Sequence, residues 1–415
     1  MIINDPVHGF VEVPEGLLLQ LVQHPYMQRL GRLKQLGATH FVFPGSTHTR
    51  FQHSLGAYYL AGKAIDVLRK KGVEISDSEA EALQIALLLH DIGHGPMSHT
   101  LEGLFLPDFS HEEITQQMLK KLQQQFGEPL QMAIDILRAT YPRPFLHELA
   151  SSQLDMDRLD YLSRDSYFAG VREGNVGVAR IIRMLNVADE HLVVDEKGIY
   201  TLENYLMARR LMYWQVYLHK AVLAVKELQR QLMRRASQLR RQGEDVWAPP
   251  ALDYFLRNKV DRKFANEHGE WMEQFVEMDD SDVDCAVKQW QRSGDRVLAL
   301  LAKSYVERRF YRTEQLDAKP TEEVMQEMKR RVAEALKVAE TDGDYFVACR
   351  EACQLLYTSH GARIRVSMAD GSIKDIAKVS ELLETDMTDK VGRRIILFSF
   401  RNVPFCCQLQ NVLEK

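Results

Sequence analysis

Apolar side chains recur at the three- and four-residue spacing of amphipathic helices over most of the first 304 residues of the chain. Residues 15–37 show this spacing with an interruption near Pro25, which predicts two short helices. Residues 40–43 are rich in β-prone side chains and predict a short extended segment before a helix that begins at about Phe51. The same spacing predicts helices at five further places: residues 111–126, 129–139, 147–164, 178–185 and 202–242.

The carboxy-terminal quarter has a different pattern. Two more helices are expected after about Pro320. Residues 362–376, around a turn at Asp370–Gly371, and residues 393–400 then alternate between apolar and polar side chains, as strands do. Residues 191–201 predict a small β-hairpin with its turn at residues 196–198. The expected fold class is therefore mainly α, with three regions: a helical domain at 1–245, a helical extension at 246–319 and a small α+β region at 320–415.

One predicted helix is apolar on nearly every side and ends in a cluster of polar groups. Residues 83–89 are apolar apart from a single glutamine, and a helix without a polar face is buried. Ser78 and Glu81 have the spacing of a capping box at its start, and Gly93 follows its end. The chain therefore carries His90 and Asp91 into the interior of the protein.

The overall composition excludes some classes of protein without naming a function. The chain is 45% hydrophobic and 27% charged, with a net charge of −5, which is ordinary for a globular protein and does not indicate nucleic-acid binding. The amino terminus, "MIINDPVHGFVEV", lacks the features of a secretory leader, and no apolar run approaches the roughly 18 residues of a membrane span. Five scattered cysteines predict reduced thiols. We therefore expect a cytoplasmic protein without a membrane partner, in which Cys349 and Cys353 pack on one face of a helix.

Histidine is the unevenly distributed residue. Seven of the fourteen histidines lie between His40 and His111. Imidazole and carboxylate groups are the usual ligands of divalent transition metals, so His90 and Asp91 are candidate ligands, and His53 is a third. The fourth would be an aspartate of "LDMDRLDYLSRD". The two histidines of "HDIGH" also have the four-residue spacing found on zinc-peptidase helices. This alternative is weaker, because glycines interrupt the helix here.

The aspartate-rich segment also has a polar helical face. Asp157, Tyr161 and Arg164 lie on the same side of a helix, and Arg158 and Asp165 nearly do. A carboxylate, a phenol and a guanidinium are costly to bury together unless they line a polar site. We interpret this face as part of the site formed by the histidines.

Seven motifs in order resemble one enzyme family: "NDPVHGFVEV", "QRLGRLKQLG", "VFPGSTHTRFQHSLGAYYLAG", "HDIGHGPMSH", "SHEE", "DMDRLDYLSRD" and "MARRLMYWQVYLHK". They are similar to the deoxynucleoside triphosphate (dNTP) triphosphohydrolase branch of the HD-domain metal-dependent phosphohydrolases, which includes bacterial dGTPases. The resemblance covers roughly residues 1–225, and more weakly extends to about residue 312. It implies an HD-domain helical fold and one divalent ion per site (Mn, Mg, Fe, Co, Ni or Zn) bound by four residues: His53, His90, Asp91 and Asp157.

The resemblance also implies a reaction, the hydrolysis of a dNTP to a deoxynucleoside and inorganic triphosphate. His111 matches the family's catalytic histidine, which would protonate the departing 5′ oxygen. His94 and His99 would lie beside the α-phosphate. Glu102 stands near His111 where relatives carry aspartate, so the charge is retained on a longer side chain.

Further positions would bind the substrate. Arg50, Arg158, Arg209 and Lys220 match phosphate-contacting positions, with Arg158 in place of the usual lysine, and Tyr161 would contact the phosphates as well.

Around the sugar, the resemblance implies Gln35, Leu36, Asp165 and Tyr217. The hydrogen-bonding groups would bind the 3′ hydroxyl, while Leu36 and Tyr217 would crowd the 2′ carbon and exclude ribose.

Structural explanations stay open for single residues. His53 could be a core histidine, His111 a helix cap and Arg209 the partner of an acid on its helix. The basic segment at residues 226–241 is expected to be a solvated face. Three other histidines are interpreted as structural: His8, His24 and His40.

Other functions and partners also stay open. One alternative is an HD phosphohydrolase of another phosphoester, such as a nucleoside monophosphate or cyclic nucleotide, and another is a nucleotide-binding regulator without turnover. A homo-oligomer, dimer or tetramer, is expected. The animal relatives are activated by guanine nucleotides read by an aspartate and an arginine. Gln23 and Gly31 stand at those positions, so activation of that kind is not expected, although a different nucleotide effector stays open.

Overall fold

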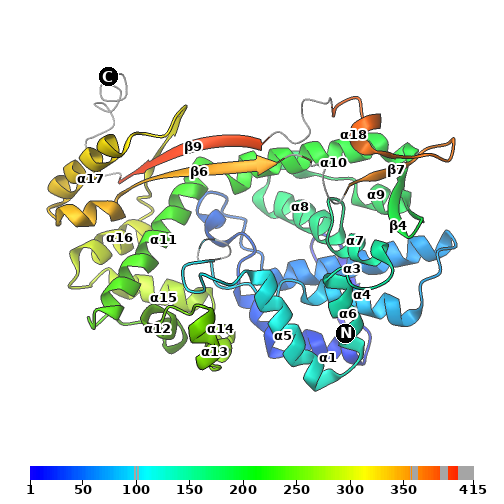
Figure 1. Ribbon diagram of the computed structural model, residues 1–415, viewed down its shortest axis with the longest axis horizontal. Coiled ribbons are helices and arrows are strands. Elements are labelled where there is room, and N and C mark those ends of the chain that lie inside the picture. Colours follow the sequence, from blue (N-terminus) through cyan, green and yellow to red (C-terminus); the bar gives the residue numbers. More distant parts are fainter. Residues whose placement is uncertain (98–99, 101, 356, 358–362, 384–390, 401–415) are drawn as a thin grey trace.

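The polypeptide folds into a mainly helical body with narrow sheets at its edges, as the apolar pattern predicts (Figure 1). The computed structural model describes all residues except 98–99, 101, 356, 358–362, 384–390 and 401–415. No helix in the described part of the chain is both long enough and apolar enough to cross a membrane.

The amino-terminal part consists of a hairpin and two short helices: β1 (Ile2–Asp5), β2 (Gly9–Glu12), α1 (Leu17–Gln23) and α2 (Pro25–Arg29). The predicted interruption near Pro25 is confirmed, because this proline occupies the first position of α2, where its missing N–H costs no hydrogen bond. The predicted extended segment at residues 40–43 is wrong. A 3₁₀ helix, Gly37–Phe41, occupies its first half and a turn follows, since no neighbouring strand pairs with this segment among the described sheets.

Three helices form the centre of the molecule: α3 (Arg50–Lys70), α4 (Asp77–Leu89) and α8 (Met156–Ala169). Helix α3 packs against both of the others. All seven residues 83–89 except Gln84 are buried, which confirms the predicted burial of α4. Its capping box is formed by Ser76 and Glu79 instead of Ser78 and Glu81. Both pairs have the required spacing, so the pattern by itself does not distinguish them.

The remaining helices surround this centre: α5 (His111–Phe126), α6 (Pro129–Leu137), α7 (Pro144–Ala150), α9 (Val178–Met184), α10 (Ile199–Met212), α11 (Lys220–Arg241), α12 (Pro250–Arg257), α13 (Arg262–Glu267), α14 (Trp271–Glu277), α15 (Asp280–Trp290), α16 (Arg296–Val306), α17 (Glu322–Leu336) and α18 (Ile376–Val379).

Two segments predicted as single helices are each divided. The first splits into α7 and α8, because the side chain of Asp155 caps the start of α8. The second splits into α10, a π-helical turn at Tyr213–Tyr217 and α11. His219 has an extended backbone and accepts a hydrogen bond from the N–H of Ala221 through its ring, so a new helix begins there. π-helical turns are frequent at functional sites.

Two sheets complete the fold. The first has the order β3 (Leu185–Ala188), β4 (His191–Asp195), β7 (Arg365–Ser367) and β8 (Ile373–Asp375); the second has the order β5 (Arg312–Leu316), β9 (Val391–Ser399) and β6 (Val347–Leu355). Strand β7 runs parallel to β4, so the carboxy-terminal region adds strands to a sheet begun in the helical domain. In Figure 1, β6 and β9 lie side by side across the top of the molecule.

The strands confirm two predictions and correct two. Strand β9 covers most of the predicted strand at residues 393–400. Strands β7 and β8 pair on either side of the predicted turn at Asp370–Gly371. The other predicted hairpin has its turn earlier than expected, at Asp189–Glu190, because both residues adopt positive φ (51° and 59°) and β3 pairs with β4. Cys349 and Cys353 lie on strand β6, so their predicted helix is wrong.

Helices α3 and α8 approach closely at Gly56. A Cβ atom at this position would lie 1.9 Å from Oδ1 of Asp160 and 2.4 Å from Nη2 of Arg164. Both side chains are fully buried and are paired with each other. The absence of a side chain at Gly56 therefore makes room for a buried ion pair.

The Gly56→Ala substitution is expected to lower the free energy of unfolding by about 3 kcal/mol or more, because it overpacks the interface and displaces a buried ion pair. The matched control is Gly62→Ala in the same helix, where the nearest atom is the flexible end of Gln84. Its effect is expected to stay within about 1 kcal/mol. Urea unfolding of both variants provides the measurement, and equal stabilities would contradict the expected role of Gly56.

Candidate active site

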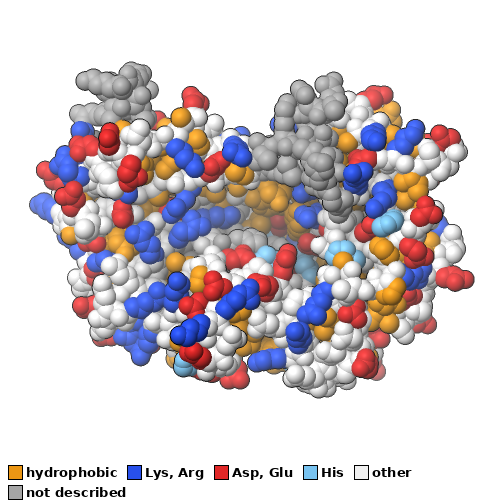
Figure 2. Space-filling model, in the orientation of Figure 1, with side chains coloured by type: hydrophobic (Ala, Val, Ile, Leu, Met, Phe, Trp, Pro, Cys, Tyr) orange, Lys and Arg blue, Asp and Glu red, His pale blue; other side chains and the backbone are white. Residues whose placement is uncertain are grey.

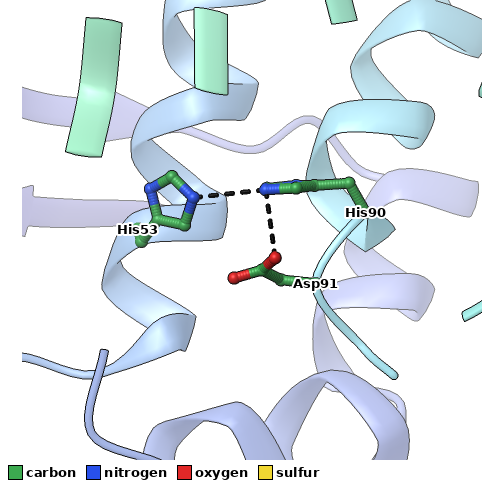
Figure 3. Close-up of side chains that lie close together, drawn as sticks. All are labelled: His53, His90 and Asp91. Carbon is green, nitrogen blue, oxygen red and sulfur yellow. Dashed lines mark hydrogen bonds and ion pairs between the residues drawn. The ribbon is translucent and has the colours of Figure 1, made fainter. Parts of the chain in front are cut away.

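Three residues far apart in the sequence form a compact cluster of potential metal ligands. Helix α3 supplies His53, and the turn after α4 supplies His90 and Asp91 (Figure 3). One ligand atom from each lies within 4.8 Å of the others. The Nε2 atoms of the two imidazoles are 3.2 Å apart, and Nε2 of His90 is 3.4 Å from Oδ1 of Asp91. These groups could hold a metal ion.

Asp157, in the first turn of α8, lies at the edge of this cluster. Its Oδ1 is 3.0 Å from Nε2 of His53 and 3.6 Å from Nε2 of His90. It is not a member of the compact triad, but it faces the same two ring nitrogens. The structure thus brings all four predicted ligands together, from α3, α8 and the turn after α4.

The charges around the cluster favour a cation. Burial would lower the pKa of His53, but hydrogen bonds to Asp157 and Asp160 outweigh this and raise the pKa to about 10. The pKa of His90 is also raised above its usual value, because Asp91 and Asp157 outweigh its burial. Two imidazoles and two carboxylates are a donor set suited to a mid-row divalent ion. The residues therefore fit the metal that the sequence implies.

The predicted catalytic residues lie next to this cluster. The ring of His111 stacks on His94, with centroids 3.9 Å apart and an angle of 15° between the planes. Nδ1 of His111 is 2.8 Å from Oε1 of Glu102, and the same oxygen accepts a hydrogen bond from the backbone N–H of His111. The longer side chain of Glu102 therefore reaches the histidine. His99 lies outside the described residues.

Burial keeps His94 neutral. Its side chain is almost inaccessible, and burial together with the neighbouring Arg50 holds its pKa well below the usual value. Its Nε2 is 3.4 Å from Oδ1 of Asp91. His94, Glu102 and His111 line a small cavity whose other wall is apolar and includes Phe105. His94 is therefore shielded from water, whereas the side chain of His111 is 25% exposed and can be reached from the solvent.

Helix α5 is anchored to the turn that carries the metal ligands. The hydroxyl of Thr115 donates to the backbone carbonyl of His90 and accepts from the N–H of Gly93. A Cβ at Gly93 would lie 2.2 Å from the carbonyl oxygen of His111. Because the turn approaches α5 so closely, His111 is held beside the metal ligands.

The predicted phosphate-binding residues have different surroundings. Nη1 of Arg50 donates to Oδ2 of Asp91 at 2.5 Å, and Arg158 pairs with Asp155 at 3.2 Å and approaches the hydroxyl of Tyr161 at 3.4 Å. The Tyr161 ring lies 6.4 Å from that of His53. Arg50 and Tyr161 thus lie beside the metal cluster. Figure 2 shows a central hollow on one face of the molecule, with histidine, Lys and Arg side chains around it.

Arg209 has donors that the described residues leave unused. Its Nε and Nη1 atoms are buried and have no hydrogen-bond partner in the described part of the protein. Its positive charge acts on Tyr161, opposing the effect of burial, which raises the pKa of that phenol. Lys220 lies elsewhere, at the exposed start of α11, where it lines a hollow with Tyr311 and Arg312. The structure therefore does not place Lys220 in the metal cluster.

The predicted sugar-binding residues meet around His48, which the sequence reasoning missed. Asp165 accepts a hydrogen bond from the hydroxyl of Tyr217 at 2.7 Å and contacts Nε2 of His48 at 2.7 Å. The carbonyl of His48 accepts from the backbone N–H of Gln35, and Leu36 follows directly. The Oε1 atom of Gln35 is buried without a partner in the described residues. His48 stands in the motif "THTRFQH", which was the available signal.

Other supporting residues carry no signal in the sequence. Asp280 accepts hydrogen bonds from the backbone N–H groups of Lys34 and Met97, and Met97 is 183 residues away in the chain. Arg29 is fully buried and donates to the carbonyls of Ile92 and Met278. Arg164 was expected to line the polar site, but it pairs with Asp160 and Asp5 behind it.

Protein-family models and solved structures match this chain. The HD domain model matches residues 50–165, and the model of the HD associated region matches residues 176–246. A crystal structure of a phosphohydrolase from Bacteroides thetaiotaomicron is 44% identical, with a TM-score of 0.94, over 97% of this chain and 100% of that chain. The chain belongs to the HD-domain phosphohydrolase family.

Curated relatives of this HD-domain phosphohydrolase include two informative cases. The uncharacterized protein YwfO of Bacillus subtilis (strain 168) is 31% identical over 401 residues, which cover 92% of this chain and 88% of YwfO. Deoxynucleoside triphosphate triphosphohydrolase SAMHD1 of Homo sapiens is 33% identical over 263 residues, which cover 53% of this chain and 42% of SAMHD1. The match thus spans less than half the length of SAMHD1.

A second solved structure is also similar. A hypothetical protein from Aquifex aeolicus has a TM-score of 0.70 at 28% identity, over 97% of this chain and 96% of that chain.

Binding of Mn²⁺ to the metal-free HD-domain phosphohydrolase is expected to release about one proton at pH 8, because His53 has a pKa of about 10 and a metal ligand must be neutral. The pKa lies above the ordinary 6.5, so the proton stabilises the metal-free protein fully below pH 6.5, and this stabilisation is lost as the pH rises through about 10. Isothermal titration calorimetry in two buffers of different ionisation enthalpy measures the release.

The control for this titration is His191→Gln, which changes an imidazole paired with Glu148 outside the metal cluster. It should release the same number of protons as the unchanged chain. A binding heat that does not depend on the buffer would contradict the expectation.

Proposed function

We propose that this HD-domain phosphohydrolase is a metal-dependent dNTP triphosphohydrolase, which converts a dNTP and water into a deoxynucleoside and inorganic triphosphate. One observation carries the proposal. Four side chains that could ligate a metal converge at the end of α4. Arg209, whose charge acts on Tyr161 beside them, has buried Nε and Nη1 atoms without a partner in the described residues. A buried cation with unused donors is costly unless a ligand satisfies it, and guanidinium is well suited to phosphate oxygens.

The metal ligands are His53, His90, Asp91 and Asp157. A divalent ion held by them would supply Lewis acidity toward the α-phosphate and toward water. The chain itself orients this donor set, since Arg50 fixes one oxygen of Asp91.

His111 is the proposed general acid. Glu102 accepts a hydrogen bond from Nδ1 of His111, so that the carboxylate stabilises the protonated ring. His94 stacks on the ring of His111 and limits its rotation. These contacts support the role of protonating the departing 5′ oxygen.

The contacts around Asp165 support selection of a deoxyribose. The hydroxyl of Tyr217 is held by Asp165, so the aromatic ring has a defined position. Gln35 contributes a buried amide oxygen without a partner in the described chain, which suits a hydroxyl donor of the sugar. Leu36 and Tyr217 would then contact the 2′ carbon. The names of the SAMHD1 relatives support the same substrate class. The homo-oligomeric state and a nucleotide effector stay predictions.

Incubation of each dNTP with the purified protein and a panel of divalent metals tests the proposal. The expected products are deoxynucleoside and triphosphate, separated by HPLC. The Asp91→Ala variant is expected to lose both bound metal and at least about 10³-fold in activity, because it removes a metal ligand and the carboxylate that pairs with Nη1 of Arg50. Orthophosphate released from nucleoside monophosphates, without triphosphate from any dNTP, would indicate the alternative phosphohydrolase instead. A protein that binds dNTPs but stays inert with every metal would indicate a regulator.

The role of Arg209 has its own test. Arg209→Gln is expected to lower kcat/KM for the preferred dNTP by about 10- to 100-fold, since a charge-assisted hydrogen bond contributes about 1.5–3 kcal/mol. Arg210→Gln, on the neighbouring position of α10, is the control and should change kcat/KM less than about threefold. Equal effects of the two substitutions would argue against phosphate binding by Arg209.

A further inference from the structure

The turn of the amino-terminal hairpin reaches into the interior beside the metal cluster. One carboxylate oxygen of Asp5 accepts hydrogen bonds from the backbone N–H groups of Val7 and His8, both at 2.9 Å. The other accepts from Nη1 of Arg164 at 2.7 Å. Asp5 thus both shapes the turn and anchors it to α8. This turn belongs to the motif "NDPVHGFVEV", to which the proposed reaction assigns no role.

Asp160 is the buried group that the turn contacts. Nε2 of His8 lies 2.6 Å from its Oδ1, and Nδ1 of His53 lies 2.7 Å from its Oδ2. Arg164 donates to both oxygens, at 2.9 and 3.0 Å. The side chains of Asp160 and Arg164 are completely inaccessible. Two histidines and one arginine therefore hold the carboxylate from three directions. The absence of a side chain at Gly56 leaves the space that this carboxylate occupies.

This arrangement determines which nitrogen of His53 carries the proton. The carboxylate of Asp160, ion-paired with Arg164, can only accept hydrogen bonds. Nδ1 of His53 must then be the donor, and its Nε2 is left to face His90 and Asp157. A metal ligand needs a free lone pair at the coordinating nitrogen, and a carboxylate behind the ring both orients it and increases its basicity.

We propose that the turn Asp5–His8 is a positioning element of the metal site, in which His8 and Asp5 act through Asp160 to hold His53 with Nε2 directed at the cation. His8 is a positioning residue, since its hydrogen bonds and ring contact within the described residues are with Asp5, Asp160 and Tyr59. The inference rests on the proposed metal site, and it is independent of which phosphoester is cleaved.

The geometry separates the contribution of His8 from that of Arg164. Both donate to Oδ1 of Asp160, but Arg164 also provides the compensating charge. The ring of His8 also stacks on Tyr59, with centroids 5.3 Å apart. A phenylalanine at this position keeps the stacked ring and removes only the hydrogen bond. Asp160 would then lose the restraint that His8 provides, and His53 would be held less firmly as a result.

Mn²⁺ binding to the full chain, measured by the decrease of the free-ion EPR signal, tests the inference. His8→Phe is expected to weaken Mn²⁺ binding by about 10- to 100-fold, as loss of an outer-shell partner does, with a melting temperature in EDTA within a few degrees of the unchanged chain. His8→Gln restores an amide donor and is expected to recover affinity to within about threefold. Phe10→Ser, at an exposed position of the same hairpin, is the control and should bind as the unchanged chain does.

A second variant addresses Asp160 directly. Asp160→Asn keeps the shape of the side chain, but its amide group can donate to Nδ1 of His53 and so favour the opposite tautomer. Its Mn²⁺ affinity is expected to fall at least about 100-fold. Because this variant also weakens the partner of Arg164, its folding is checked by circular dichroism, and His8→Phe remains the deciding variant if it unfolds.

Wild-type Mn²⁺ affinity in folded His8→Phe would overturn the inference, as would a His8→Gln variant as weak as His8→Phe. Failure of the unchanged chain to bind Mn²⁺ would overturn the metal site and this inference together. Mn²⁺ binding with the expected pattern of variants, but without triphosphate release from any dNTP, would overturn the proposed substrate alone.

Discussion

The burial of Asp160 is the constraint on which both the fold and the site depend. A carboxylate removed from water destabilises a protein by several kcal/mol unless opposite charge and hydrogen bonds compensate for it. Arg164 supplies the charge, and His8 and His53 occupy the remaining directions around the carboxylate. Helix α8 must therefore lie against α3 at Gly56, with the amino-terminal hairpin beside both. The same contacts that make this burial tolerable also orient a metal ligand.

Opposite charges are kept in neighbouring regions of the site. Carboxylates surround the imidazoles of His53 and His90 and raise their pKa values, which suits a cation. Close by, Arg209 retains buried donors that suit an anion. A chain with a net charge of −5 attracts no polyanion as a whole. The proposed triphosphate would instead be bound by local charge, in a setting where the surrounding protein screens it less than water does.

Local structure could be predicted where a single segment contains its own determinants. The burial of α4 follows from its uniform apolar character, and the start of α2 follows from Pro25. Predictions failed where two local solutions are close in energy or where a distant partner decides. The capping box could be Ser76–Glu79 or Ser78–Glu81 on spacing alone. Residues 40–43 are β-prone but have no strand to pair with among the described sheets, and Cys349 joins a strand because β9 lies beside it.

By itself the sequence determined the mainly helical class and the position of the polar cluster at the end of a buried helix. It also determined which residue types could ligate a metal. All three follow from periodicity and motif spacing, which are local properties of a chain. Only the tertiary structure decided that Asp157 faces both histidines, that Asp160 lies behind His53 and that Asp280 supports two loops of the site. These contacts join segments that are far apart in the sequence, and their geometry follows from how helices pack around buried charge. His8 shows the same limit, because only its contact with Asp160 reveals that a histidine interpreted as structural lies behind the metal site.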